Sequence, residues 1–104
     1  MSEEALTEFR FAGVIIEWRG PSPWFFLPVP TEFSCQLGVL AKAVSYGWGV
    51  IPVDGWLGDT PFTTSLFPKN GSYFLPLKAQ VRRQAAVTAG DLVEVTMRIQ
   101  ATVR

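Results

Sequence analysis

Residues 9–18 read FRFAGVIIEW, and this stretch decides the fold that the sequence predicts. Phe9 and Phe11 alternate with a polar and a small residue, as expected for a strand with one buried face. After Gly13 the apolar phase moves by one position, to Val14, Ile16 and Trp18. A one-residue shift turns side chains to the opposite face of a sheet, so the pattern predicts a bulge or sharp bend near this glycine. Small β-barrels need such bends to close.

Apolar residues occupy every second position from 93 to 103, between polar residues. This is the strongest periodic signal in the chain, and it predicts a long strand with one wet face. A turn is predicted at residues 88–91, directly before this strand, because Gly90 can adopt a positive φ and Asp91 can cap the turn with its side chain.

Two hairpins are predicted upstream of this strand. Gly58-Asp59 is the predicted turn between strands at 50–57 and 62–67. Asn70-Gly71 is the predicted turn that leads to the next strand, at 73–77, and Asn-Gly is the strongest short hairpin signal in the chain.

Helical periodicity replaces alternation at residues 31–46. The apolar residues that share one face of this predicted helix are Phe33, Leu37, Leu40 and Val44. Thr31 is its predicted N-cap, and Gly47 is the residue predicted to follow its C-terminus. A second, short helix is predicted between Leu77 and Val87, where it connects the second hairpin to the final strand.

The segment 21–30, PSPWFFLPVP, raises the question whether its aromatic residues are buried or displayed to a ligand. Alternation places Trp24 and Phe26 on one side and Phe25 and Leu27 on the other. Prolines at both ends limit the segment to a short strand. We therefore favour a short strand in the wall of a β-barrel, with buried aromatic residues, over an exposed row of aromatic residues that binds a ligand.

The predicted order of elements is β, β, α, β, β, β, α, β. This order predicts a mainly β fold, a small closed six-stranded antiparallel β-barrel capped by two short helices. At 104 residues the chain has the usual length of a single domain, here residues 1–104, with 1–7 as a flexible N-terminal tail. Prolines at strand edges discourage open-ended pairing, so we expect a monomer or a homodimer.

The composition indicates a packed protein without a strong electric field. Hydrophobic residues make up 48% of the chain and charged residues 17%, which excludes a disordered chain. Nine basic and nine acidic residues cancel, so net charge attracts neither nucleic acid nor a membrane surface. No uncharged stretch is long enough to span a bilayer, and the acidic N-terminus lacks the features of a secretion signal. We therefore expect a cytoplasmic protein with no membrane partner.

The chain contains no histidine and a single cysteine, Cys35. These absences exclude Ser-His-Asp and Cys-His nucleophile pairs, His-based metal sites and an internal disulfide. We predict no cofactor and no metal site. Cys35 is interpreted as a small buried apolar residue of the first helix, because no basic residue adjoins it to activate the thiol.

The candidate ligand-binding residues are Trp48, Trp56, Thr64, Lys78, Arg82 and Arg83. The two tryptophans can line a concave mouth, since aromatic residues dominate small-molecule pockets, or they can fill the core. The threonine belongs to a run of three hydroxyl residues that can line a polar pocket or simply favour a strand. The three basic residues form the only basic cluster, which can hold a phosphate or carboxylate or be a solvated helix face.

The predicted function is that of a non-catalytic binding module for a small ligand or a protein partner. One alternative is a nucleic-acid-binding barrel that uses the basic cluster, although the neutral net charge speaks against it. Another alternative is a hydrolase or transferase that uses Asp54, Asp59 or Ser65. For this third reading the sequence offers no constellation with the needed geometry, and no histidine can activate Ser65.

The chain also resembles a known family. The residues that carry the resemblance are Trp48-Gly49, Pro52-Val53, Gly58, Thr64-Ser65-Leu66-Phe67-Pro68, Tyr73, Leu75-Pro76, Lys78, Val81-Arg82 and Gly90-Asp91-Leu92-Val93, with Phe9, Trp24 and Pro28 in the earlier half. As a set they resemble the bacterial and archaeal family called domain of unknown function 1905. The resemblance implies a small closed β-barrel and no established activity. The chain departs from the family pattern at Ala86, where a glycine would usually end the second helix, and at Phe62, where tryptophan is common.

Overall fold

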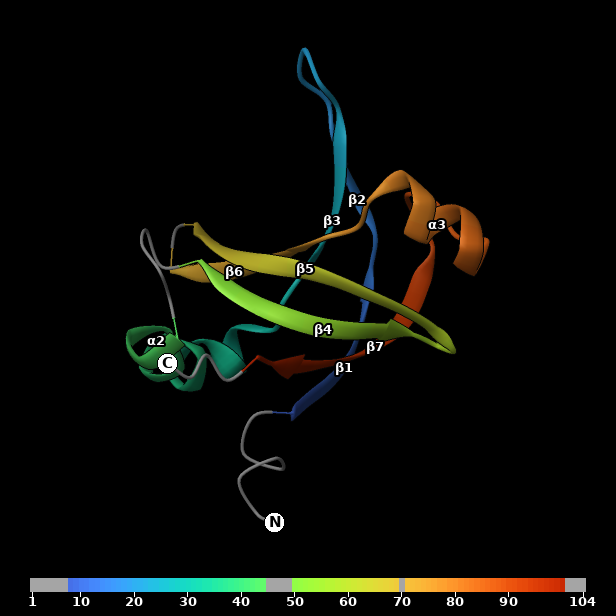
Figure 1. Ribbon diagram of the computed structural model, residues 1–104. Helices are drawn as coiled ribbons and strands as arrows, with labels where there is room; N and C mark the ends of the chain where they lie inside the picture. Colours follow the sequence, from blue (N-terminus) through green and yellow to red (C-terminus); the bar gives the residue numbers. More distant parts are fainter. Residues whose placement is uncertain (1–7, 45–49, 70, 101–104) are drawn as a thin grey trace.

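The computed structural model describes residues 8–44, 50–69 and 71–100 as one strongly curled antiparallel sheet, an open half-barrel, with two helices (Figure 1). The seven strands are β1 (Glu8–Val14), β2 (Ile16–Trp18), β3 (Trp24–Pro28), β4 (Ile51–Leu57), β5 (Thr60–Lys69), β6 (Ser72–Pro76) and β7 (Leu92–Ile99). The helical elements are the 3-10 turn η1 (Thr31–Phe33), α2 (Ser34–Val44) and α3 (Ala79–Ala85). The predicted tail at 1–7, Gly47 and the predicted end of the last strand at 101–103 lie outside the described residues.

The sheet curls because strands change partners along their length. Its strand order is β1-β7-β4-β5-β6-β3-β2. Strand β5 pairs with β4 through residues 60–66 and with β6 through residues 67–69. The two strands at the ends of the order, β1 and β2, are separated in the chain only by Ile15. The Ile15 N–H donates to the Asp91 carbonyl at 3.0 Å, and the Ile15 carbonyl accepts from the Gly90 N–H at 2.8 Å. These two hydrogen bonds fix Ile15, the residue between β1 and β2, to the segment just before β7.

The predicted closed six-stranded barrel is corrected to a seven-stranded open half-barrel. The sequence was interpreted as one bent strand at 9–18. In the structure this segment forms two strands with different partners, because β1 pairs with β7 and β2 pairs with β3. Each end of the strand order therefore has its own edge strand.

The predicted change of face at Gly13 is wrong. Phe9 and Ile15 are both buried, whereas the even positions Val14, Ile16 and Trp18 are 47%, 42% and 48% exposed. The alternation therefore continues in one phase through the whole segment. The glycine has a different role, because a Cβ on Gly13 would lie 3.3 Å from Cδ2 of Leu27. Its missing side chain lets β1 pass close to β3 inside the curl.

The core fills the inside of the curl. Its largest fully buried side chains are Ile15, Leu27, Leu37, Ile51, Leu66, Leu75, Leu77, Met97 and Val53. The Phe33 ring of η1 lies 5.1 Å from the Phe9 ring and 6.2 Å from the Phe11 ring, between centroids. Through these contacts η1 covers part of the core, and α2 and α3 lie at opposite ends of the curl (Figure 1).

Both predicted helices are confirmed within the described residues, with differences at the first one, whose predicted last positions 45 and 46 lie outside them. Thr31 opens η1 and is not an N-cap, since Pro30 holds that place and no side chain caps the turn. Cys35 is exposed on α2 and is not buried as predicted. The reason is the helical period, which turns Leu37 and Ala41 into the core and leaves Cys35 on the opposite side.

The predicted turns are confirmed at their described residues, and Asn70 of the predicted Asn70-Gly71 turn lies outside them. Gly58, Gly71 and Gly90 have φ angles of 56°, 80° and 92°, so each occupies the region that favours glycine. The Thr88 N–H donates to the Asp91 carboxylate at 2.8 Å, and Asp91 thus caps the turn before β7. The alternation of β7 is confirmed as well, with buried side chains at Val95, Met97 and Ile99.

Ala86 ends α3 in the left-handed region, with φ 58° and ψ 47°. Its N–H donates to the Arg83 carbonyl at 3.2 Å, and the Val87 N–H donates to the Arg82 carbonyl at 3.0 Å. Glycine is the residue that most often occupies this position after a helix, because a Cβ in the left-handed region is strained. The family departure at Ala86 therefore leaves the exit geometry intact and places a strained residue there.

We expect Ala86→Gly to raise the free energy of unfolding by about 0.5–1 kcal/mol, the relief of left-handed strain minus the added entropy of an unfolded glycine. Chemical denaturation measures this change. The matched control is Ala79→Gly, at the exposed start of the same helix, which should lower the stability or leave it unchanged. A less stable Ala86→Gly variant would contradict the strain.

Gly55 on β4 lies opposite Phe62 on β5, and a Cβ on Gly55 would lie 2.6 Å from Cζ of the buried phenylalanine ring. Gly55→Ala should therefore lower the free energy of unfolding by about 1–3 kcal/mol through overpacking. Phe62→Leu removes the overlapping atoms, so the double variant should be more stable than the sum of the two single changes indicates. Strictly additive costs in denaturation experiments would show that the two residues do not meet.

Candidate functional site

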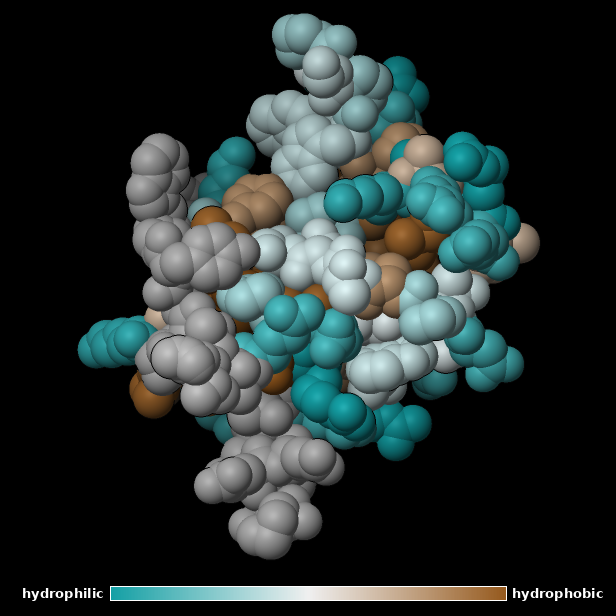
Figure 2. Space-filling model, in the orientation of Figure 1, coloured by the Kyte–Doolittle hydropathy of each residue, from teal (hydrophilic) through white to brown (hydrophobic). Residues whose placement is uncertain are grey.

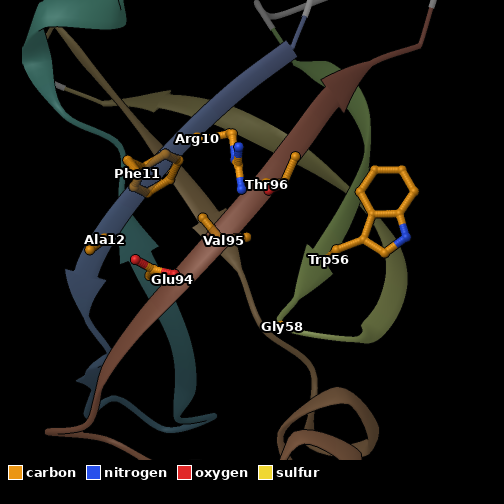
Figure 3. Close-up of a pocket in the computed structure, with 8 residues that line it drawn as sticks. All are labelled: Arg10, Phe11, Ala12, Trp56, Gly58, Glu94, Val95 and Thr96. Atoms are coloured by element: carbon orange, nitrogen blue, oxygen red, sulfur yellow. The ribbon is translucent and has the colours of Figure 1, made fainter.

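The outer surface of β1, β7 and β4 carries a pocket of about 290 Å³ (Figure 3). The residues that line it are Arg10, Phe11, Ala12, Trp56, Gly58, Glu94, Val95 and Thr96. The sheet positions them, because the outward positions of three adjacent strands meet there. The pocket thus combines a guanidinium group, a carboxylate, a hydroxyl and an indole ring.

Strand register sets the geometry of this site. Thr96 of β7 pairs with Arg10 of β1 on one side and with Trp56 of β4 on the other. Since neighbouring strands lie about 4.8 Å apart, the Cα atoms of Arg10 and Trp56 are about 10 Å apart across β7. Glu94 lies two residues before Thr96 on the same outward face and pairs with Ala12. Figure 3 shows Arg10, Thr96 and Trp56 in a row across the three strands.

Arg10 and Glu94 bring opposite charges to the pocket, and within the described residues neither forms an ion pair. By contrast, the next outward-facing pair of β1 and β7, Glu8 and Arg98, interacts within the protein, since Arg98 Nη2 donates to Glu8 Oε1 at 3.5 Å. The Arg98 guanidinium also lies 5.4 Å from the centroid of the Trp56 ring. Arg10 and Glu94 are therefore the charged residues of the pocket without a described protein partner.

Trp56 is half-buried and also borders a second hollow, of about 320 Å³. The other residues around this hollow are Asp54, Gly55, Pro61, Phe62 and Thr63. Trp56, which was predicted as a ligand-binding residue, thus separates two adjacent depressions on the outer surface. Trp48 lies outside the described residues.

Thr64 and the basic residues lie away from this pocket. Thr64 is half-buried on β5, in phase with the buried Phe62 and Leu66, so its side chain belongs to the inner face. Lys78 lines a hollow of about 230 Å³ between β5 and α3, together with Gln80 and Gln84.

The Arg82 side chain is bound to other parts of the fold. Its Nε donates to the Leu77 carbonyl at 3.1 Å, and its guanidinium lies 3.5 Å from the centroid of the Phe25 ring. The Leu77 N–H in turn donates to the Phe25 carbonyl at 2.9 Å. Arg82 therefore fastens the start of α3 to β3, whereas Arg83 is exposed.

Asp54, Asp59 and Ser65, the residues of the hydrolase or transferase alternative, lie on β4, on β5 and in the turn between them. Asp54 accepts a hydrogen bond from Gln100 Nε2 at 3.0 Å, and Asp59 is exposed in the β4–β5 turn. Ser65 is half-buried on β5. Across the described part of the chain, no three His, Cys, Asp or Glu side chains gather into a group that could hold a metal ion. No helix in the same residues has the length and apolarity needed to cross a membrane.

Sequence reasoning missed the three polar residues of the pocket, Arg10, Glu94 and Thr96. Arg10 lies more than eighty positions before the other two, and none of the three belongs to a motif. Only the β1–β7 register brings them together. The one available signal was that Arg10, Glu94 and Thr96 alternate with apolar residues, which places them on the wet faces of their strands.

Comparison with known families gives a match over most of the chain. The family described as "Domain of unknown function (DUF1905)" matches residues 11–97, which is most of the chain and contains every pocket residue except Arg10. A search of curated protein sequences finds no match.

The contacts of Arg82 lead to a stability prediction. Arg82→Gln should lower the free energy of unfolding by about 1–3 kcal/mol, because the Leu77 carbonyl loses its donor and Phe25 loses the stacked cation. Arg83→Gln is the matched control on the same helix, and an exposed change of this kind should stay within about 0.5 kcal/mol. Denaturant unfolding of both variants measures the difference. Equal stabilities would argue that Arg82 is as free as its neighbour.

Proposed function

The chain belongs to the DUF1905 family, and we propose that its curled sheet acts as a non-catalytic binding module for a small zwitterionic ligand. The observation that carries this proposal is the pocket in which Arg10, Glu94, Thr96 and Trp56 meet. The volume of about 290 Å³ lies at the lower end of small-molecule sites and suits a ligand of amino-acid size.

The chemistry of the pocket supports a ligand with two opposite charges. The Arg10 guanidinium can hold a carboxylate through two parallel hydrogen bonds. The Glu94 carboxylate can accept hydrogen bonds from an ammonium group, and the Thr96 hydroxyl can donate or accept between them. The Trp56 indole offers a flat surface for the apolar part of the ligand.

The placement of these residues on strands favours binding. Each belongs to a paired strand of the sheet, so the pocket is largely formed before a ligand arrives. A preorganised site loses less conformational entropy on binding than a site on loops. This rigidity is what a small ligand, with few contacts to offer, requires.

The other candidate functions receive less support. A nucleic-acid site would need the basic cluster to act together, and Arg82 is already engaged with Leu77 and Phe25. A hydrolase or transferase would need an activated nucleophile or a positioned pair of carboxylates, and of the two candidate aspartates Asp54 is hydrogen-bonded to Gln100 while Asp59 is exposed in the β4–β5 turn. The chain also has no histidine to serve as a general base at neutral pH.

A binding screen tests the proposal. The probes are free amino acids, simple monocarboxylates, primary amines and neutral monosaccharides, titrated against the protein while tryptophan fluorescence is recorded. We expect at least one amino acid to bind, and the monocarboxylate or amine with the same side chain to bind about 10–100-fold more weakly, because each lacks one charged contact.

Three variants identify the site. Trp56→Ala should abolish binding, and Arg10→Gln and Glu94→Gln should each weaken it about 10–100-fold. Arg19→Gln is the control, an exposed arginine outside the pocket, and calorimetry replaces fluorescence for the tryptophan variant. No binding by any amino acid, or binding that Trp56→Ala leaves intact, would refute the proposal.

A further inference from the structure

A second outer surface, on β2, β3, β6 and the end of β5, is aromatic. The residues that form this aromatic face are Ile16, Trp18, Trp24, Phe26, Phe67 and Phe74. Cross-strand pairing aligns them, since Ile16 faces Phe26, Trp18 faces Trp24, and Phe67 faces Phe74. This face lies on the opposite side of the sheet from the core, because the alternate residues Leu27, Leu75 and Leu66 are the ones that fill the curl.

Four rings of the aromatic face, those of Trp24, Phe26, Phe67 and Phe74, form one continuous cluster. Trp24 lies 4.7 Å from Phe26 and 5.2 Å from Phe67, between ring centroids. Phe74 lies 4.4 Å from Phe26 and 5.9 Å from Phe67. These contacts leave Phe26 only 5% exposed although it points away from the core. Of the aromatic residues predicted to be buried in the strand at 21–30, Phe26 is buried, whereas Trp24 and Phe25 are half-buried.

The cluster continues into exposed apolar side chains. Trp18 and Ile16 are about half exposed, and Val14 lies two residues further along the same outward side of the chain. Val14 is paired with Leu92, which is 72% exposed. Among the described residues, these four are the exposed large hydrophobic side chains apart from Val39 on α2. Figures 1 and 2 show the β2–β3 hairpin standing out from the body of the molecule, so this surface is prominent.

The size of the exposed part matches a dimer interface. With roughly 200 Å² for a fully exposed large side chain, the four residues expose on the order of 400 Å² of apolar surface. Interfaces are about 60% apolar, so such a patch corresponds to about 700 Å² per partner. A standard stable interface buries about 800 Å² per partner.

Charge also favours a second copy of this chain over a charged partner. The formal net charge is zero, so two copies do not repel each other. The charged groups near Trp18 already interact with neighbours in the same chain. Lys69 Nζ lies 4.6 Å from the centroid of the Trp18 ring, and Arg19 Nε lies 3.8 Å from Glu17 Oε1. An apolar face is complementary to itself, which is what a twofold interface requires.

We propose that the aromatic face, with Val14 and Leu92, is the interface of a homodimer in which the same surface of a second copy covers it. This inference is independent of the proposed ligand pocket, since the two sites share no residue. It selects the homodimer from the two oligomeric states that the sequence left open.

Sedimentation velocity and light scattering over a dilution series test the dimer. The wild-type chain should reach twice its mass of 11.5 kDa. Trp18→Glu should raise the dimer dissociation constant about 100-fold or more, because it replaces a large exposed aromatic side chain of the interface with a charge. Ile16→Lys is a second variant of the same face, and circular dichroism confirms that each variant is folded.

The matched control is Val39→Ser, which removes an exposed apolar side chain from α2 and should leave the dissociation constant unchanged. A wild-type chain that stays monomeric up to its solubility limit would overturn the proposal. So would a dimer that survives both face variants, or one that Val39→Ser dissociates equally well. A monomer that co-purifies with another protein, and loses it in Trp18→Glu, would assign the face to that protein and overturn the homodimer.

Discussion

The constraint on which the structure depends is the single alternation of side chains from Phe9 to Trp18, combined with a change of pairing partner at Ile15. Residues up to Val14 pair with β7 and residues from Ile16 pair with β3, so the pairing partner changes within one residue. The sheet must therefore curl around the hydrophobic core on its inner side. Gly13 permits the close approach of β1 to Leu27 that this curl requires. The same phase that buries Phe9 and Ile15 forces Val14, Ile16 and Trp18 outward, and so creates the exposed apolar surface.

The sequence predicted those elements whose signals are local. Turn glycines such as Gly58 and Gly90, the side-chain cap of Asp91 and the alternation of β7 all depend on neighbouring residues, and all were placed correctly. The apolar run after Gly13 was misinterpreted because burial was assumed for any regularly spaced hydrophobic residue. Nothing local distinguishes a tryptophan that faces the core from one that faces outward. The strand count failed for a separate reason, because β1 and β2 pair with different strands.

The candidate site was predictable only in its aromatic member. Trp56 stood out because aromatic residues dominate small-molecule pockets, whereas Arg10 and Glu94 join it in one pocket only through the register of three strands. Register depends on the whole sheet and leaves no mark on spacing. The basic cluster illustrates the opposite case, in which Arg82 looked available from its helical spacing but is held by a carbonyl and a ring from other elements.

The pairing of Glu8 with Arg98 has a mechanical consequence. These residues lie near the beginning and the end of the described chain, and in the antiparallel ladder of β1 and β7 they sit at the same end. A force that pulls these two positions apart would load the hydrogen bonds of that ladder one after another, as in opening a zipper, and not all at once by shear. Under tension applied in this way, the curled sheet would peel open from the β1–β7 end.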